Sequence, residues 1–429
     1  MPETLAAIPV GKLPREGNES VEMDAAAMGK GAAHLHVSVG ENRRDTMPAV
    51  RILCVGGGPA GLYFALLHKK ACPADHVVVV ERNRADATYG WGVVFSDKAL
   101  TFLEGGDARF MADLRTRLES WDDLTVVHRD DRISLDGHAF TAIARLELLQ
   151  LLQRHCAAAG VEMRFETRVG RVTLDDYDLV VGSDGVHSCV RDQFAPHFEP
   201  TSRLLSNKYV WYGTPRVFDT LSLIFREFDS GFYVAHAYRF SPRASTFLVE
   251  CDVDTWNRAG LSAMNDEESR AYCARIFARD LHGHQLMSNK SAWTSFTVSS
   301  NARWSHRNVV LVGDALRSVH FSIGSGTRLA LEDAMALHRA IQSTGTLSQA
   351  LDTFETTRRP IVEKIIEAAA RSSEWYEQFH EHMTMAPHEF AMSYATRSGR
   401  VSRGQLEQTS PRFLALYDRW IADNASSAN

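Results

Sequence analysis

Short apolar runs bounded by turn residues recur along the chain and predict the strands of a buried sheet. Continuous runs of this length, rich in valine, isoleucine and leucine, are typical of parallel strands that are covered on both faces. Five stretches predict such strands: residues 50–55, 77–80, 161–165, 178–182 and 308–312. Helical patterns lie between or after these strands, at residues 62–69, 144–159 and 326–341. The alternation of strands and helices favours an open α/β sheet.

The middle of the chain has a different pattern. Between residues 206 and 252, aromatic and β-branched stretches alternate with turn residues, which predicts antiparallel strands and a second sheet. We expect most of its aromatic side chains to pack in a core. An earlier hairpin is predicted at residues 133–141, turning at Asp136-Gly137. Toward the C-terminus, a long helix is predicted to pass through Pro360 and to end near Phe379.

Together these patterns predict an α/β (α+β) chain with four parts. A Rossmann-like nucleotide-binding domain takes residues 47–200 and 300–345, and a mostly antiparallel sheet domain is inserted at residues 201–299. Residues 346–429 form a helical C-terminal region. Residues 1–46 mix proline, glycine and charged residues without periodicity, so we expect a disordered leader, with Met47 as an alternative start.

Composition narrows the classes of function. The chain has 429 residues, 45% of them hydrophobic and 23% charged, with a net charge of -6, which gives no reason to expect a nucleic-acid partner. No apolar run approaches the roughly 20 residues of a membrane span. The six cysteines are scattered without a C-x-x-C pair. We therefore expect a cytoplasmic protein with reduced thiols and no metal site.

The first strand leads into a glycine turn that suits a dinucleotide. Gly56, Gly58 and Gly61 fit the pattern G-x-G-x-x-G, with Ala60 inside it, and a helix follows. The glycines permit a tight turn, a close approach to a pyrophosphate and close packing of helix on strand. Glu81 follows the second strand, where a carboxylate accepts a ribose hydroxyl. The alternative is a glycine-rich turn without a ligand.

Two further strand ends carry polar residues of the same kind. Asp184 and Gly185 follow the strand at 178–182, and Gly313 and Asp314 follow the strand at 308–312. Open α/β sheets place ligands at the carboxyl ends of their strands. The next helix is preceded by the stretch Gly324-Ser325-Gly326, whose two glycines leave N–H donors exposed.

Arg145 stands in the first turn of the helix at 144–159, where a cation opposes the helix dipole. The position indicates either a phosphate partner or a solvated surface arginine.

In this order, the three motifs resemble those of the FAD-dependent aromatic hydroxylases, the para-hydroxybenzoate hydroxylase-like flavoprotein monooxygenases. The resemblance covers about residues 50–379, and its third motif, Gly313-Asp314 with Gly324-Ser325-Gly326 and Glu332-Asp333-Ala334, is quite specific. The stretches at 90–97, 320–327 and 375–390 look like the branch acting on salicylyl-CoA and anthraniloyl-CoA. Because the chain ends at residue 429, we expect a stand-alone salicylyl-CoA 5-hydroxylase type without an additional flavin barrel domain.

The resemblance implies a cofactor, a reaction and a set of contacts. FAD would be reduced by NADH or NADPH as a transient co-substrate. O₂ would then form a flavin C4a-hydroperoxide, whose distal oxygen is attacked by the ring of an aromatic small-molecule or acyl-CoA substrate. The expected FAD contacts are Gly56, Gly58, Ala60, Gly61, Glu81, Arg82, Arg145, Asp184, Gly313, Asp314, Gly324, Ser325 and Gly326.

Two residues near the third motif call for separate treatment. His320 is a candidate catalytic residue, and the alternative is a packed, hydrogen-bonded histidine. Leu316-Arg317 stand where the family usually has Ala-His, so we expect a bulkier side chain and a fixed cation near the flavin.

Other functions remain open on the sequence alone. They are hydroxylation of a free aromatic such as tryptophan, a flavin-linked reductase of the same fold, and a flavin-free relative without enzymatic activity. The sequence distinguishes neither NADH from NADPH nor one oligomeric state from another.

Overall fold

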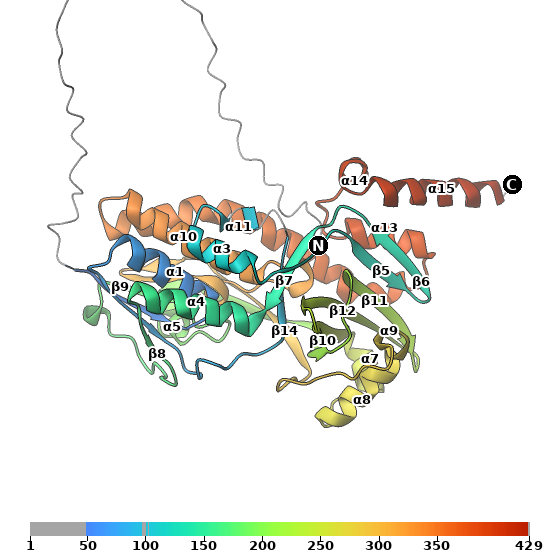
Figure 1. Cartoon of the computed structure of the whole chain (residues 1–429), viewed down its shortest axis with the longest axis horizontal. Helices are drawn as coiled ribbons and strands as arrows, with labels where there is room; N and C mark the ends of the chain where they lie inside the picture. The colour runs from blue at the N-terminus through green and yellow to red at the C-terminus, as the bar shows by residue number, and fades with distance from the viewer. Residues whose placement is uncertain (1–48, 97–99, 102, 428–429) are drawn as a thin grey trace, which may run out of the picture.

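The computed structural model describes residues 49–96, 100–101 and 103–427. The predicted leader and the start at Met47 lie outside the described residues. Figure 1 shows a sheet with helices at one end of the molecule and a second, twisted sheet at the other end, with the long helix α11 (Leu347–Glu377) running along both. The predicted α/β class is confirmed.

The first sheet contains the predicted parallel strands and brings their carboxyl ends together. Strand β1 (Arg51–Val55) lies between β2 (His76–Val80) and β9 (Leu179–Gly182), and β16 (Val309–Leu311) lies beside β9. The glycine turn after β1, the Asp184 turn after β9 and the Asp314 turn after β16 therefore share one edge. The sheet order is β15 (Ser305–His306), β16, β9, β1, β2 and β8 (Glu162–Arg164).

Three helices cover this sheet and carry much of its core. Each of them begins next to the edge of the sheet that the three turns share, and its first turn contains a glycine or an arginine. They are α1 (Pro59–Ala71), α4 (Arg145–Ala159) and α10 (Gly326–Ser343). Shorter helices border the sheet and the connections: α3 (Ala108–Arg115), α5 (Cys189–Gln193) and α6 (Ala195–Phe198).

The second sheet is mostly antiparallel, and its four central strands agree with the prediction. Each of its faces buries a different set of side chains, because successive residues of a strand point to opposite faces. One face packs on α7 (Val253–Arg258), α8 (Asp266–Ile276) and α9 (Ala278–Leu281). The order is β14 (Thr294–Asn301), β10 (Pro200–Thr214), β13 (Ala244–Cys251), β12 (Gly231–Ser241), β11 (Leu221–Phe228), β5 (Leu124–His128) and β6 (Asp131–Leu135).

The predicted hairpin at residues 133–141 is wrong. Strand β6 pairs with β5 in the second sheet, whereas β7 (Phe140–Ala144) pairs with β3 (Gly92–Ser96) and β4 (Glu119–Trp121) in a third sheet. The turn at Gly137 has the expected positive φ of 71°, but the chain crosses between sheets there. The Asp136 carboxylate accepts the backbone N–H of Phe413 at 2.8 Å, which fixes the turn against the C-terminal region. Residues 124–135 thus supply two strands to the second sheet from outside the expected 201–299 segment.

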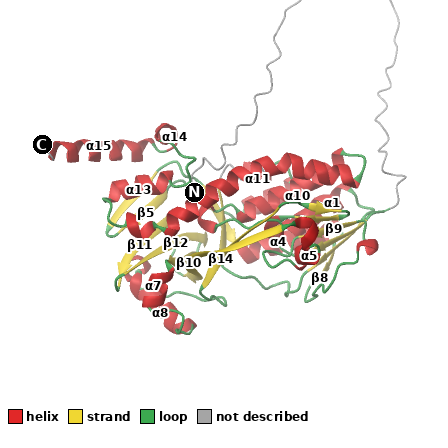
Figure 2. Ribbon diagram, turned by 180° about the vertical axis from the view of Figure 1, so that it is seen from behind, coloured by secondary structure: helices red, strands yellow, loops and turns green. Residues whose placement is uncertain are grey.

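The C-terminal region is helical, as predicted, and holds the two sheets together. The Phe225 ring on β11 lies within 6 Å, centroid to centroid, of Trp375 on α11 and Phe390 on α13 (Pro387–Thr396). Helix α12 (Phe379–His382) and α14 (Arg403–Thr409) are short, and Figure 2 shows α15 (Pro411–Ser427) extending away from the body. Within the part of the chain that the structure describes, no helix combines the length and apolarity needed to cross a membrane.

Candidate functional site

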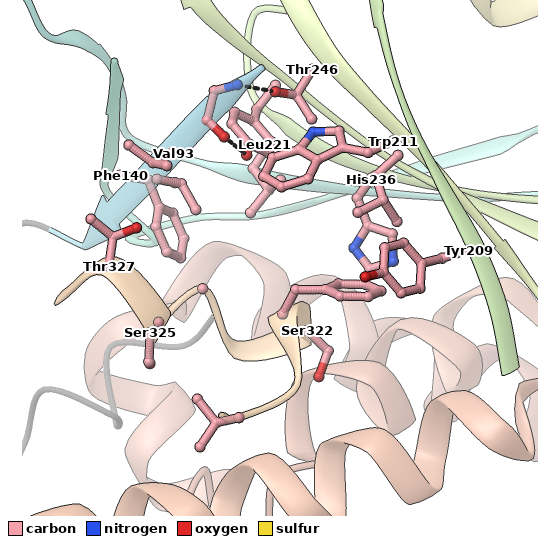
Figure 3. A pocket seen from close by; sticks show the side chains of 18 of the residues that line it. Val93, Phe140, Tyr209, Trp211, Leu221, His236, Thr246, Ser322, Ser325 and Thr327 are labelled. Carbon is pink, nitrogen blue, oxygen red and sulfur yellow. Dashed lines mark hydrogen bonds between the residues drawn. The ribbon is translucent and has the colours of Figure 1, made fainter. Parts of the chain in front are cut away.

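A cavity of about 220 Å³ lies between the second sheet and the start of α10 (Figure 3). Its sheet wall follows the pleat: alternate residues of β10 and β12, such as Tyr209 and Trp211 or His236 and Tyr238, face the cavity. Their neighbours Val210 and Tyr212 pack on the other face, against α7–α9. The opposite wall contains Asp314 and the residues 324–327. One cavity therefore joins the third motif to the aromatic face of the second sheet.

The glycine turn has the geometry that the motif predicts. Gly56 has a φ of +107°, and a Cβ there would lie 2.4 Å from the backbone oxygen of Ser183. Gly58 precedes α1 without a side-chain cap, so the first N–H groups of the helix are left to a ligand. Glu81 accepts the Gly57 N–H at 2.8 Å. A second cavity, of about 100 Å³, is lined by Gly57, Gly58 and Glu81 among others.

Arg145 connects the two cavities, because its side chain lines both of them. Its backbone N–H donates to the Trp91 carbonyl oxygen at 2.7 Å, which fixes the start of α4. Among the described residues, no hydrogen-bond or ion-pair partner is found for its guanidinium. Burial lowers the pKa of Arg145, and the Asp314 carboxylate opposes this effect. An enclosed arginine that lacks a protein partner fits a bound anion such as the pyrophosphate of FAD.

The third motif presents a carboxylate and free N–H groups to the main cavity. Gly313 has a φ of +60° and packs against Ala60, to which a Cβ at Gly313 would come within 3.1 Å. The Asp314 side chain is accessible from the cavity and otherwise enclosed by protein, and this enclosure raises the pKa of the Asp314 carboxyl. Ser325 stands before α10 without capping it, and a Cβ at Gly326 would meet nothing within 4 Å. The start of α10 can thus approach a flat ring.

Not all predicted contacts line these cavities. Asp184 accepts the Ser188 hydroxyl at 2.5 Å and the Cys189 N–H at 2.7 Å, so its carboxylate closes the turn before α5. Arg82 lines a neighbouring surface cavity. His320 is buried and does not line the main cavity; its Nδ1 accepts the Ser322 N–H at 3.4 Å.

Arg317 does not line the main cavity, but its charge acts on the cavity residue Asp314 and lowers the pKa of that carboxyl, so a fixed cation near the flavin stays a prediction. The Arg317 guanidinium forms two hydrogen bonds with Asp333, a residue of α10 that has no exposed surface. Both side chains of this pair are buried, and Asp333 also accepts a hydrogen bond from Arg358 on α11. The unusual residue at position 317 therefore belongs to a buried ion network.

Sequence reasoning missed the residues on the sheet wall. The aromatic residues Tyr209 and Trp211 were expected in a core, and they line the cavity. His236 lines the cavity as well, and its Nε2 lies 3.3 Å from the Glu250 carboxylate. The sequence contained a sign of this: His236 and Glu250 are ionisable residues inside largely apolar strands. Both lie on the face of the sheet opposite to the one that packs on helices.

One group of possible metal ligands occurs among the described residues, far from the glycine turn at the other end of α1. His68, Cys72 and Asp75 have donor atoms within 4.8 Å of one another. His68 and Asp75 already form a 2.8 Å hydrogen bond, and Asp75 also accepts the Val50 N–H. These contacts close the connection between α1 and β2.

Comparison with known proteins agrees with this geometry. The family model of the FAD binding domain matches residues 49–369. The chain is 39% identical to a salicyloyl-CoA (salicylyl-CoA) 5-hydroxylase of Streptomyces, over 86% of this chain and 74% of the relative. It is 36% identical to the 3-hydroxy-4-methyl-anthranilyl-(aryl-carrier protein) 5-monooxygenase of Streptosporangium sibiricum, over 82% and 95% of the two chains.

A solved structure shows the same fold. The p-nitrophenol 4-monooxygenase of Pseudomonas putida superposes with a TM-score of 0.68 at 17% identity, covering 86% of this chain and 98% of that one. The family model, the two relatives and the cavity that joins the third motif to an aromatic wall lead to one conclusion. The chain belongs to the FAD binding domain family and is an FAD-dependent aromatic monooxygenase.

Proposed function

We propose that this enzyme hydroxylates the ring of an aromatic acyl thioester, using NADH or NADPH and O₂. The observation that carries the proposal is the single cavity shared by the third motif and the aromatic wall of the second sheet. A ring held by Tyr209, Trp211 and Phe296 lies beside the loop that would carry the flavin. Such a cavity positions the ring and excludes water from the reaction.

The residues around the two cavities fit FAD. The first N–H groups of α1 and the Arg145 guanidinium would hold the pyrophosphate, and Glu81 would accept a ribose hydroxyl. Asp314 would lie at the ribityl chain, and the N–H groups at Ser325 and Gly326 would face the ring. The Gly324 N–H donates to the Phe321 carbonyl oxygen at 2.8 Å, so Gly324 would shape the loop beside the ring. Arg82 and Asp184 remain proposed contacts at the adenosine end, together with Gly56, Gly61 and Gly313 in the turns. Bound FAD, once reduced by the nicotinamide, supplies the chemistry that activates O₂.

The names of the two relatives suggest one class of substrate. Salicyloyl-CoA is a 2-hydroxybenzoyl thioester, and an anthranilyl group on a carrier protein is a 2-aminobenzoyl group. Both relatives are named for oxidation at position 5, which is para to the 2-substituent. We therefore propose a benzoyl thioester with an electron-donating group at position 2, and hydroxylation at position 5.

A substrate panel tests this proposal. The FAD-loaded protein would be mixed with NADH or NADPH, and nicotinamide oxidation would be followed with salicyloyl-CoA, anthraniloyl-CoA, salicylate, anthranilate and tryptophan. The proposal predicts strong stimulation by a thioester and a product heavier by one oxygen. Stimulation by a free aromatic alone would contradict the thioester, and purified protein without flavin would contradict the cofactor.

A further inference from the structure

The main cavity contains several titratable side chains, and their positions limit which of them can accept a proton from a substrate. Those lining it are Arg145, Tyr209, His236, Tyr238, Asp314 and Tyr394. Arginine stays protonated at all accessible pH values. Asp314 lies in the turn after β16, on the opposite wall from the sheet, where its neighbouring charges are Arg145, Arg317 and Asp333. The remaining candidates on the sheet side are His236 and the three tyrosines.

The three tyrosines are protonated phenols at neutral pH. Burial raises the pKa of Tyr238 to about 12, and it raises the pKa of Tyr209 and Tyr394 as well. The Tyr238 hydroxyl also donates to the Gly92 carbonyl oxygen at 2.7 Å, which fixes its orientation. Histidine is the side chain that ordinarily exchanges a proton between pH 5 and 8. His236 is thus the group on the sheet wall that is suited to act as a base.

Glu250 fixes the orientation of the His236 ring. The two residues lie on neighbouring strands, β12 and β13, and both point to the cavity face of the sheet. His236 Nε2 is 3.3 Å from a Glu250 carboxylate oxygen, while the other oxygen accepts the Asn207 side-chain N–H at 2.9 Å. Burial alone would raise the pKa of Glu250. The hydrogen bonds that the carboxylate accepts from His236 and Asn207 oppose this effect, and the Glu250 pKa lies below its usual value.

An ionised Glu250 requires the proton of a neutral His236 to be on Nε2. The other ring nitrogen, Nδ1, then carries a lone pair, and we find no hydrogen-bond partner for it among the described residues. The ring itself is held by stacking on Tyr376, 5.1 Å between centroids, and by an edge contact with Phe321 at 5.4 Å. Figure 3 shows the imidazole beside Tyr209, within the group of aromatic side chains.

We infer that His236 is the general base of this site and that Glu250 is its positioning residue. Resting on the proposed function, the inference concerns the 2-hydroxyl group of a bound aryl thioester. The O–H bond of that group breaks, the proton forms a bond to His236 Nδ1, and the electron pair stays on the oxygen. Its charge is delocalised to position 5 of the ring, the carbon that is oxidised. The imidazolium formed is compensated by the Glu250 carboxylate, which keeps its own charge.

Other charged or titratable groups near the pair have different roles. His320 is neutral, since burial lowers its pKa to about 4, and its Nε2 is 3.9 Å from Glu250, beyond a hydrogen bond. Further groups near the pair are the phenols of Tyr209 and Tyr376, the Arg397 guanidinium, which lies over the Tyr394 ring, and Glu377, whose charge acts on His320. The sequence candidate His320 is buried next to Glu250 and is not among the residues that line the cavity.

Ionisation of a bound phenol tests the inference without turnover. FAD-loaded protein would be saturated with salicyloyl-CoA in the absence of NADH and NADPH, and phenolate absorbance would be recorded from pH 5.5 to 9.5. The complex with benzoyl-CoA, which lacks the hydroxyl group, would serve as the spectral reference. The variants are His236→Gln and Glu250→Gln. The matched control is His128→Gln, which alters a buried histidine of the same sheet that is bonded to the Met383 carbonyl oxygen.

The inference predicts that His236→Gln raises the pKa of the bound phenol by about one unit or more, equivalent to a tenfold loss of phenolate at low pH. Glu250→Gln shifts it in the same direction by less, and His128→Gln leaves it unchanged. Affinity for benzoyl-CoA stays within about threefold in both site variants, while kcat falls by about 10²-fold or more in His236→Gln.

Two outcomes would overturn the inference, and they differ in what else they contradict. If salicyloyl-CoA binds and its phenol ionises at the same pH in wild type and both site variants, only the role of His236 is refuted. If the wild type binds no aryl thioester, the proposed function is refuted with it. Flavin content and Tm show whether each variant is folded. If His236→Gln loses its flavin, the test rests on Glu250→Gln, which should also raise the pKa of the bound phenol.

Discussion

The substitution Asp333→Asn removes a charge that connects three parts of the FAD-binding region. The carboxylate has no exposed surface and accepts the Gly313 N–H at 3.0 Å, the Arg317 guanidinium at 2.8 Å and the Arg358 guanidinium at 3.0 Å. These donors belong to the turn after β16 and to α11, and Asp333 itself belongs to α10. One side chain thus fixes the turn that carries Asp314.

The expected cost follows from the burial of this network. An asparagine keeps the shape and loses the charge, so two buried guanidinium groups lose a partner; breaking a buried pair costs about 3–5 kcal/mol. At roughly 2–4 °C per kcal/mol for a large domain, Tm should fall by about 6–20 °C. Because the Gly313 turn loses its strongest acceptor, the variant should also retain less FAD after gel filtration.

The assay is thermal unfolding of FAD-loaded protein, with Arg279→Met as the control. Arg279 pairs with Asp130 on the surface, where the two side chains are 77% and 76% exposed, so the substitution should cost less than about 1 kcal/mol. Adding Arg317→Met to Asp333→Asn should restore part of the loss, since it removes one unpaired cation. An Asp333→Asn protein that melts with the wild type would refute the reasoning.

Three further predictions concern the cofactor turn, its phosphate site and pH. Gly56→Ala should abolish FAD retention, since the added Cβ would lie 2.4 Å from a backbone oxygen. Gly170→Ala, whose Cβ would meet nothing within 4 Å, should retain as much FAD as the wild type. The flavin absorbance of the purified proteins measures both. Arg145→Met should weaken FAD binding by about 10- to 100-fold, the value of a charge-assisted hydrogen bond; Arg154→Met, an exposed arginine of the same helix, should match wild type in fluorescence titrations. Burial lowers the pKa of His138 to about 3 from 6.5. Below pH 6.5 His138 is therefore protonated in the unfolded chain and stays neutral in the folded chain. The free energy of unfolding should fall as the pH drops from 6.5, by up to about 1.4 kcal/mol per pH unit. The free energy of unfolding would be measured by urea denaturation at several pH values. In His138→Gln this free energy should change less with pH than in the wild type, and the same pH dependence in both proteins would contradict the assignment.

Much of the fold was predictable because local patterns and sheet topology agree. The apolar runs at β1, β2, β9 and β16 are buried, and glycine turns follow three of them, β1, β9 and β16, which supports their prediction as parallel strands. The error at Asp136-Gly137 arose because a turn signal specifies the local bend and not the partner strand. The two flanking strands pair in different sheets, and what fixes the turn is Phe413, which lies 277 residues away. No short-range pattern contains that contact.

The two walls of the site differ in how far they could be predicted. Gly56, Arg145 and Asp314 stand at strand or helix ends, where the backbone itself creates a ligand site. His236 and Glu250 stand inside strands, so their role depends on which face of the sheet is open. That choice is set by α7–α9, which cover the opposite face. Likewise, the pairing of Arg317 with Asp333 could not be predicted, because the packing of α10 brings the two side chains together.

The most direct test of the central claim is the fate of oxygen from ¹⁸O₂. FAD-loaded enzyme would be incubated with salicyloyl-CoA and NADH, or NADPH, under ¹⁸O₂, and the thioester would be analysed by mass spectrometry and NMR. The account predicts one ¹⁸O atom in the product, at position 5 of the ring, with one nicotinamide oxidised per product. Nicotinamide oxidation that yields only hydrogen peroxide, with the thioester unchanged, would contradict it.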